Sequence, residues 1–331
     1  MLEPETETIK EGVKKYCPIL ETVRKEVHKS IVGQDVIIDA LLRGLLAGGN
    51  VLVEGVPGIA KTVTIKSLAQ ALGCKFSRIQ FTVDLLPTDI VGITVYDEKR
   101  GFYTIKGPIF SNFILADEIN RAPAKTQSAL MEAMQEQQVT IGRKTFKLES
   151  PFFVMATENP LESAGTYKLP EAQLDRFLFK LMMDYPDAES EKLIITNNMN
   201  LKTFEDFKIV PVLGPQELIE MQKFVKTIYL KDEIKDYIVN LIEATRKPKE
   251  FGITLGKYLE WGASPRASIN MYISSKADAL IKGQHYVTPQ NIKTVAADIL
   301  RHRVSMNYEA QAEGITTDHF VNELLSKIPV P

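Results

Sequence analysis

The stretch from Asn50 to Thr62 reads N-V-L-V-E-G-V-P-G-I-A-K-T. An apolar run rich in β-branched residues enters a Gly/Pro turn, and a Lys-Thr pair follows the turn. A phosphate-binding loop reads G-x-x-x-x-G-K-[ST] between a strand and a helix. Gly55, Lys61 and Thr62 keep this spacing, but Ala60 stands where the last glycine is expected. The alternative interpretation is an ordinary strand-turn-helix with a solvated lysine.

A phosphate-binding loop (P-loop) works because successive backbone N–H groups point at phosphate oxygens and the next helix adds its dipole. Lys61 would then lie on the β- and γ-phosphates, and Thr62 would offer its hydroxyl to Mg²⁺. Ala60 can be accepted if its φ is negative, because only a methyl group must then fit. The candidate nucleotide-binding residues are Gly55, Val56, Pro57, Gly58, Ile59, Ala60, Lys61, Thr62 and Val63.

A second motif, F-I-L-A-D-E over 113–118, is an apolar strand that ends in Asp117 and Glu118. In a P-loop ATPase we expect such a strand to lie beside the P-loop strand. Its first acid would order Mg²⁺, and its second would polarise the attacking water. A strand that simply ends in two acids is the alternative, but together with the P-loop this motif predicts an ATPase.

Two further polar residues lie near strand ends. The segment V-M-A-T-E-N-P (154–160) places Asn159 where an amide can orient the lytic water, although an Asn-Pro turn is the alternative. The segment L-D-R-F (174–177) places Arg176 just before the last strand. Arginine stabilises the charge of a transferring phosphoryl group. The alternative for Arg176 is a surface salt bridge with Asp175 or another neighbour.

Strands alternate with helical segments from residue 51 to residue 183, which predicts a parallel α/β sheet. Two segments of alternating residues, at about 92–107 and 138–149, predict β-hairpins. Their predicted tips are charged and contain Lys99, Arg100, Arg143 and Lys144. After Tyr185 long helical segments dominate, and we find no convincing strand. The predicted domains are therefore an α/β nucleotide-binding domain over 1–185 and a helical domain over 186–331.

Composition excludes several classes of protein. The 331 residues include 40 Lys and Arg and 42 Asp and Glu, for a net charge of −2, so no overall basic field exists to hold nucleic acid. Arg301, His302 and Arg303 are interpreted as a solvated helix face rather than a basic patch. Cys17 and Cys74 do not form a CxxC pair. No signal core or membrane span is apparent, and we expect a reducing cytoplasm.

The order of the motifs, followed by S-P-R-A at 264–267, strongly resembles the MoxR family of AAA+ ATPases, and the match covers essentially the whole chain. The resemblance implies a P-loop AAA+ core with a five-stranded parallel sheet, two hairpin inserts and an all-α lid. It also implies roles for the site residues. Lys61 and Thr62 match the Walker A motif, and Asp117 and Glu118 match the Walker B motif. Asn159 matches sensor 1, Arg176 matches the arginine finger and Arg266 matches sensor 2, while the segment that wraps the adenine is matched by Ile31, Val32, Gly33 and Gln34. One departure is Glu158, where the family usually has glutamine, which leaves the positioning of water there open.

The resemblance further implies a homo-oligomeric ring, expected to be a hexamer, that uses ATP and Mg²⁺ to remodel, assemble or activate protein clients. Proteins with a von Willebrand factor A domain are among the expected partners. A nucleic-acid-dependent motor or loader of the same superfamily is the alternative, although no zinc module, helix-turn-helix or dominant basic face supports it. A scaffold that binds ATP but barely hydrolyses it is a third reading, against which the intact Glu118 argues.

Overall fold

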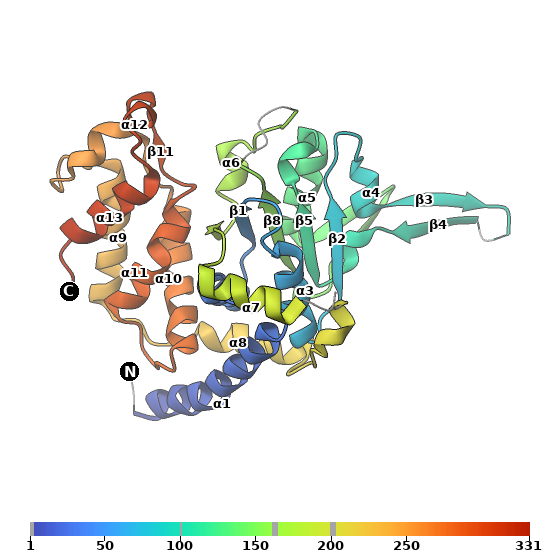
Figure 1. Cartoon of the computed structure of the whole chain (residues 1–331), viewed down its shortest axis with the longest axis horizontal. Coiled ribbons are helices and arrows are strands. Elements are labelled where there is room, and N and C mark those ends of the chain that lie inside the picture. The colour runs from blue at the N-terminus through green and yellow to red at the C-terminus, as the bar shows by residue number, and fades with distance from the viewer. Residues whose placement is uncertain (1–2, 100, 161–164, 199–202) are drawn as a thin grey trace.

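A computed structural model describes residues 3–99, 101–160, 165–198 and 203–331 (Figure 1). Its centre is a sheet of five strands in the order β2-β5-β8-β1-β9, and every neighbouring pair in it is parallel. The predicted five-stranded parallel sheet is therefore confirmed. Its strands are β1 (Val51–Gly55), β2 (Phe76–Gln80), β5 (Phe113–Asp117), β8 (Phe153–Glu158) and β9 (Phe179–Met183).

One expectation about the strand order is wrong, because β5 does not lie beside the P-loop strand β1. Strand β8 separates them, and its residue Ala156 pairs with Leu52 on one side and with Ala116 on the other. Strand order depends on long-range packing, which the local sequence of a strand does not specify. The consequence is that the end of β8, followed by Asn159, lies between the P-loop and the acidic end of β5.

Both faces of the sheet are buried, which explains why its strands read as nearly continuous apolar runs. In β1, Val51 and Val53 belong to one hydrophobic core and Leu52 to the other. Helix α3 (Lys61–Ala71) packs in the first core and α5 (Ala124–Glu136) in the second. Shorter elements complete this part of the chain: α4 (Pro87–Val91), α6 (Glu171–Leu174), and the 3₁₀ turns η1 (Pro108–Phe110) and η2 (Ile119–Arg121).

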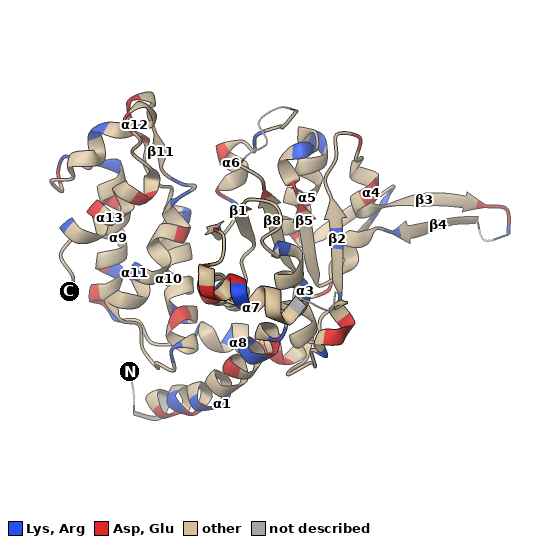
Figure 2. Ribbon diagram, viewed as in Figure 1, with Lys and Arg blue, Asp and Glu red and all other residues tan. Residues whose placement is uncertain are grey.

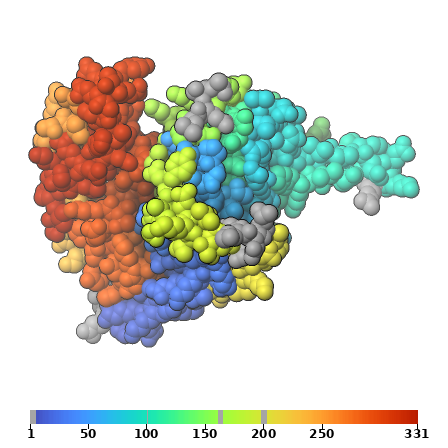
Figure 3. Space-filling view, in the orientation of Figure 1, coloured from blue at the N-terminus to red at the C-terminus, as the bar shows by residue number. Residues whose placement is uncertain are grey.

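Two antiparallel hairpins interrupt the α/β pattern where the alternation predicts them. They are β3 (Gly92–Asp97) with β4 (Gly101–Lys106), and β6 (Gln138–Ile141) with β7 (Lys144–Lys147). The β3–β4 hairpin protrudes from the body (Figures 1 and 3), and its charges gather mainly at its tip (Figure 2). Arg100, predicted at that tip, lies outside the described residues. A Cβ placed on Gly142 would lie 3.0 Å from Thr94 Oγ1, so the second hairpin's turn touches the first hairpin.

The rest of the described chain is mostly helical, as predicted. Strands β10 (Leu259–Trp261) and β11 (Ser305–Met306) are an addition, and they form a small antiparallel pair that is too short to show alternation in the sequence. None of the described helices is long and apolar enough to cross a membrane. The helical elements are α1 (Glu3–His28), α2 (Asp35–Ala47), α7 (Ala188–Asn198), η3 (Phe204–Phe207), α8 (Pro215–Val225), α9 (Asp232–Arg246), η4 (Thr254–Tyr258), α10 (Pro265–Ile281), α11 (Pro289–Leu300), α12 (Tyr308–Ala312) and α13 (Thr317–Lys327).

A buried ion pair fixes α2 to α10. Arg43 Nη1 lies 2.9 Å from Asp278 Oδ1, and the two side chains are only 7% and 1% exposed. Lys282 and Asn291 both donate to the other carboxylate oxygen. Residues of α1, α2, the sheet and the C-terminal helices also share one hydrophobic core. Removing one partner of a buried ion pair costs about 3–5 kcal/mol, so these contacts hold the helical part firmly against the sheet. The domain division at residue 185 stays a prediction.

Candidate active site

The P-loop leaves β1 at Gly55 and enters α3 at Lys61. Gly58 has a φ of 87°, and a Cβ placed on it would meet no atom within 4 Å, so the loop borders open space at this point. No side chain caps the N-terminus of α3. The first N–H groups of a helix lack intrahelical partners, and the helix dipole places positive charge there. The loop therefore fits the phosphate groups of a nucleotide.

Ala60 adopts a left-handed conformation with φ 64° and ψ 21°, so the expectation of a negative φ is wrong. It is the N-cap residue of α3, where the chain changes direction from the loop into the helix. A left-handed conformation costs an L-residue about 1–2 kcal/mol, whereas glycine adopts it readily. The alanine is therefore tolerated at the cost of local backbone strain, which is often found in loops that bind ligands.

Ala60→Gly is expected to raise the free energy of unfolding by about 0.5–1 kcal/mol, because glycine relieves this strain but loses more conformational entropy on folding. Urea unfolding of the wild type and the variant measures the difference. Ala129→Gly, inside α5, is the matched control and should lower stability by about 1 kcal/mol. If both variants lose stability to the same extent, Ala60 is not left-handed in solution.

Lys61 and Thr62 are the first two residues of α3. Lys61 Nζ donates a hydrogen bond to the carbonyl oxygen of Gly55 at 2.6 Å. Burial lowers the pKa of the Lys61 ammonium, and the charges of Asp117 and Glu118 oppose this shift. The structure thus brings the lysine of the P-loop close to Asp117, at the end of β5, and to Glu118, which follows it.

Asp117 is held by two residues to which no sequence motif assigns a role. Arg78 of β2 donates to Asp117 Oδ2 through Nε at 3.0 Å and Nη2 at 2.6 Å. Thr157 Oγ1 donates to the other carboxylate oxygen at 2.6 Å. Asp117 itself is only 9% exposed. Its carboxylate is therefore fixed in direction by both neighbouring strands, β2 and β8.

Glu118 is held in the same way. Gln80 Nε2 donates to Glu118 Oε2 at 2.7 Å, and Arg121 Nη1 lies 2.9 Å from the same oxygen. Arg78 and Gln80 are two residues apart in a β-rich run, so the sequence could have placed them on one face of a strand. Only the strand order, with β2 beside β5, shows that this face meets the two acids.

Asn159 follows β8 and is 6% exposed. The preceding residue, Glu158, lies opposite Glu54 of β1, and Lys180 Nζ lies 2.6 Å from Glu54 Oε2. Burial raises the pKa of Glu158; Lys180 opposes this shift, and Glu54 adds to it. The carboxyl group that replaces the expected glutamine is therefore shifted toward its neutral form, which resembles an amide more closely than a carboxylate does.

The segment predicted to lie around an adenine is next to the P-loop. Gln34 Nε2 donates to the carbonyl oxygen of Asp184, just after β9. A mostly apolar lining with a few polar groups is typical of a site for a flat organic base. This segment and the P-loop line one cavity of this kind, and its lining residues are Lys29, Ser30, Ile31, Val32, Gln34, Gly58, Ile59, Ala60, Pro186, Ile194, Asn197 and Phe207.

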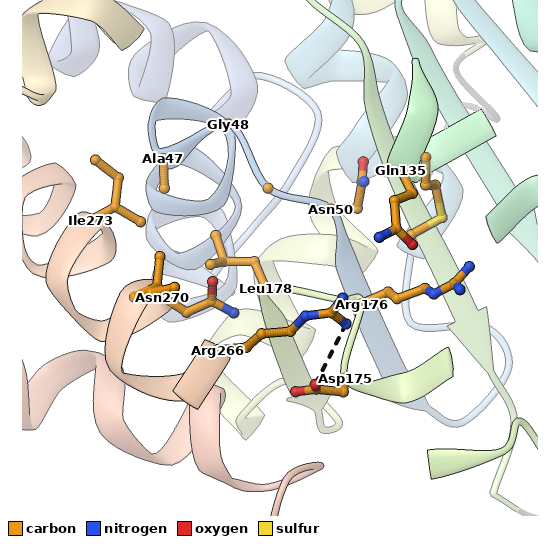
Figure 4. Close-up of a pocket in the computed structure, with 13 residues that line it drawn as sticks. Ala47, Gly48, Asn50, Gln135, Asp175, Arg176, Leu178, Arg266, Asn270 and Ile273 are labelled. Carbon is orange, nitrogen blue, oxygen red and sulfur yellow. Dashed lines mark ion pairs between the residues drawn. The ribbon is translucent and has the colours of Figure 1, made fainter. Parts of the chain in front are cut away.

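Arg176 and Arg266 do not lie with the P-loop, Asp117 and Glu118. Arg176 precedes β9, whose first residue, Phe179, pairs with Val51 at the start of β1. The P-loop follows the other end of β1, so the length of this strand, about 15 Å, separates the two edges of the sheet. Arg176 and Arg266 line one cavity at the far edge, together with Asn50 (Figure 4).

The side chain of Arg176 is exposed and points away from Arg266 (Figure 4). Asp175 does not pair with it; this carboxylate lies 2.8 Å from Arg303 Nε and 3.5 Å from Arg266 Nη1. Within the described part of the chain, the Arg176 guanidinium forms no hydrogen bond or ion pair. Among the described residues, therefore, nothing supports the alternative interpretation of Arg176 as a surface salt-bridge residue.

Comparison with known proteins gives consistent matches. Residues 50–179 match the model of the ATPase family associated with various cellular activities (AAA), and residues 256–324 match the AAA lid domain. Chaperone MoxR1 of Mycobacterium tuberculosis is 45% identical over 97% of this chain and 85% of its own length. Protein MoxR of Methylorubrum extorquens is 28% identical over 93% of this chain and 94% of its own. The crystal structure of a putative ATPase from Cytophaga hutchinsonii superposes with a TM-score of 0.91 at 44% identity, covering 98% of both chains.

Proposed function

The chain belongs to the MoxR family of AAA+ ATPases, and from this premise we propose that it hydrolyses ATP at sites completed by neighbouring copies of itself. The separation of the two groups of residues supports this proposal. Lys61 and Glu118 lie at one edge of the sheet, whereas Arg176 lies at the other edge with its guanidinium unengaged by the described residues. An arginine so placed can reach a bound nucleotide only on another copy of the chain, and a head-to-tail interface of this kind forms a ring when the rotation between copies closes.

Within one copy, each residue has a distinct task. The P-loop N–H groups and Lys61 bind the phosphates, and the lining around Ile31 and Val32 receives the base. Thr62 and Asp117 would hold Mg²⁺, which neutralises phosphate charge when it is bound. Glu118 accepts a proton from the attacking water, and Asn159 orients that water. The copy that follows in the ring supplies Arg176, with Arg266 beside it.

The work done by hydrolysis is proposed to be the remodelling, assembly or activation of protein clients by a ring, expected to be a hexamer. A relative named as a chaperone supports this. So does the protruding β3–β4 hairpin, where Tyr96 and Phe102 are 61% and 78% exposed. Such a hairpin is marginally stable alone in water, and its exposed aromatic side chains suit contacts with protein. A von Willebrand factor A domain protein is the proposed type of partner.

Measuring phosphate release at several protein concentrations tests the proposal. Release should require Mg²⁺ and should rise faster than linearly with protein concentration in the range where rings form, because each site needs two copies. Added DNA should leave the rate unchanged. A rate that is proportional to concentration down to demonstrated monomer would contradict shared sites, and strong stimulation by DNA would favour a nucleic-acid motor.

Replacing residues 97–101 by an Asn-Gly turn is expected to leave nucleotide affinity and Tm nearly unchanged, because Asp97, Glu98 and Lys99 of the β3–β4 hairpin are exposed. The same change should weaken stimulation of ATP hydrolysis by a von Willebrand factor A domain protein. Calorimetry and phosphate release with and without that protein give the two measurements. The β6–β7 turn has only two residues between its paired strands, so Arg143→Ser at its tip is the parallel test. A large drop in Tm would show that the hairpin is structural instead.

A further inference from the structure

The interpretation of Arg301, His302 and Arg303 as a solvated helix face is wrong. His302 is 8% exposed, and the side chain of Arg303 is only 1% exposed. Both residues follow the end of α11 and turn inward against the start of β9, where His302 Nε2 lies 3.1 Å from the carbonyl oxygen of Phe177. A buried guanidinium is costly unless it is fully hydrogen-bonded, so its partners show what it does.

All five N–H donors of a guanidinium are used by Arg303. Nε donates to Asp175 Oδ1 at 2.8 Å, and Nη2 donates to the carbonyl oxygens of Asp175, at 3.0 Å, and Phe177. Nη1 donates to the carbonyl oxygens of Leu178 at 3.2 Å and Ile299 at 2.7 Å. Three of these five acceptors are backbone carbonyls at 175, 177 and 178. The guanidinium therefore clamps the short segment that carries Arg176.

Asp175 extends the clamp to the second arginine. Its carboxylate accepts hydrogen bonds from Ser264 Oγ at 3.1 and 3.2 Å and lies 3.5 Å from Arg266 Nη1 (Figure 4). Ser264 is the N-cap residue of α10, and Arg266 lies in the first turn of that helix. One carboxylate thus connects Arg303, the segment of Arg176 and the helix that carries Arg266.

We propose that Arg303 and Asp175 are positioning residues, which fix Arg176 and Arg266 in the direction needed to act on the nucleotide of the neighbouring copy. This inference rests on the proposed function. Apolar residues of similar volume often stabilise a fold as well as a buried ion pair does, so stability alone does not account for this arrangement. What the planar fork adds is a fixed geometry for three backbone carbonyl groups, at 175, 177 and 178, at once.

Arg303→Lys keeps the positive charge but leaves three donors and no planar fork. Because misplacing a reacting group by about 1 Å can cost about 100-fold in rate, turnover is expected to fall by about 10–100-fold. The dissociation constant for a fluorescent ATP analogue should stay within about two-fold, since the P-loop lies at the other edge of the sheet. Equal losses in affinity and turnover would overturn the proposal.

Mixing two variants gives a measurement that a purely structural role of Arg303 would not change. Arg303→Lys mixed with Glu118→Gln should regain ATPase activity, because some interfaces pair an intact Glu118 with an intact Arg303. Arg303→Lys mixed with Arg176→Ala should not, because every interface then lacks a correctly placed Arg176. Failure of the first mixture, with mixed assemblies demonstrated, would overturn the positioning role.

A reference mixture separates this inference from the proposed function. If Arg176→Ala and Glu118→Gln restore activity together but Arg303→Lys and Glu118→Gln do not, only the positioning role fails. If the reference mixture itself stays inactive, the proposed shared active site is contradicted, and with it the positioning role that rests on it.

Arg43→Lys is the matched control, since Arg43 is also a buried guanidinium paired with a carboxylate of the helical part. The polar partner of Arg43 among the described residues is Asp278 and not residues 175–178, so Arg43→Lys should lower Tm while turnover per folded subunit stays within about two-fold of wild type. If Arg303→Lys does not fold, Asp175→Asn keeps the side-chain volume, removes the carboxylate charge and undergoes the same mixing tests. Lack of restoration with Glu118→Gln would then overturn the proposal equally.

Discussion

Glu118→Gln is expected to bind ATP with nearly wild-type affinity and to lose about 10²–10⁴-fold in turnover, because a positioned general base contributes about that much. The amide keeps the shape of the side chain and can still be held by Gln80 or Arg121, so the site should stay folded. Lys61→Ala should instead lose ATP binding, since it removes the cation that faces the phosphates and lies close to Asp117 and Glu118.

Titration with a fluorescent ATP analogue and a phosphate-release assay separate the two effects. Lys66→Ala is the control, because Lys66 is in the same helix but lies 3.9 Å from Glu205 and is not in the P-loop. Its nucleotide affinity should equal that of the wild type. If Lys61→Ala and Glu118→Gln weaken nucleotide binding equally, the division between binding and chemistry is wrong.

Arg176→Ala is expected to bind ATP, assemble at least partly and lose about 10³-fold or more in turnover, the size of effect found for arginine fingers. Little change in Tm is expected, because this side chain is exposed and has no partner among the described residues. Arg176→Lys should retain only part of the activity, since lysine keeps the charge but not the fork. A large fall in Tm would mean that Arg176 supports the fold.

Local patterns were sufficient for most of the fold. The strand-turn-helix around Lys61 and the two hairpins follow from residue spacing and alternation, and the structure contains them within a few residues of their expected bounds. The conformation of Ala60 could not be inferred in this way. Its positive φ comes from the direction in which α3 leaves the loop, and an alanine carries no sign of that constraint.

Long-range packing determines the strand order and the buried contacts that local sequence patterns do not predict. The insertion of β8 between β5 and β1 separates the P-loop from the acids by one strand, and the placement of β2 beside β5 brings Arg78 to Asp117. Arg303 looks like a surface residue in its charged segment, yet it is buried against a segment more than a hundred residues away in the chain. Side chains of this kind are specified by tertiary contacts, so their roles emerge only in three dimensions.

The placement of Arg176 and Arg266 on one cavity is also a result of long-range packing. The resemblance to MoxR proteins assigned each arginine a role, but it did not decide whether Arg266 acts within its own subunit or on a neighbour. The structure places both arginines on one cavity at the far edge of the sheet. This placement supports the proposal that the two act together on the nucleotide of the neighbouring copy.

The most direct test of the shared active site is the ATPase activity of Arg176→Ala mixed with Glu118→Gln. Each variant alone should be nearly inactive. In mixed rings, an interface that joins an intact Glu118 to an intact Arg176 should work, so random one-to-one mixing is expected to restore about a quarter of wild-type activity if interfaces act independently. A mixture that stays inactive, while mass spectrometry shows that mixed assemblies have formed, would contradict the account.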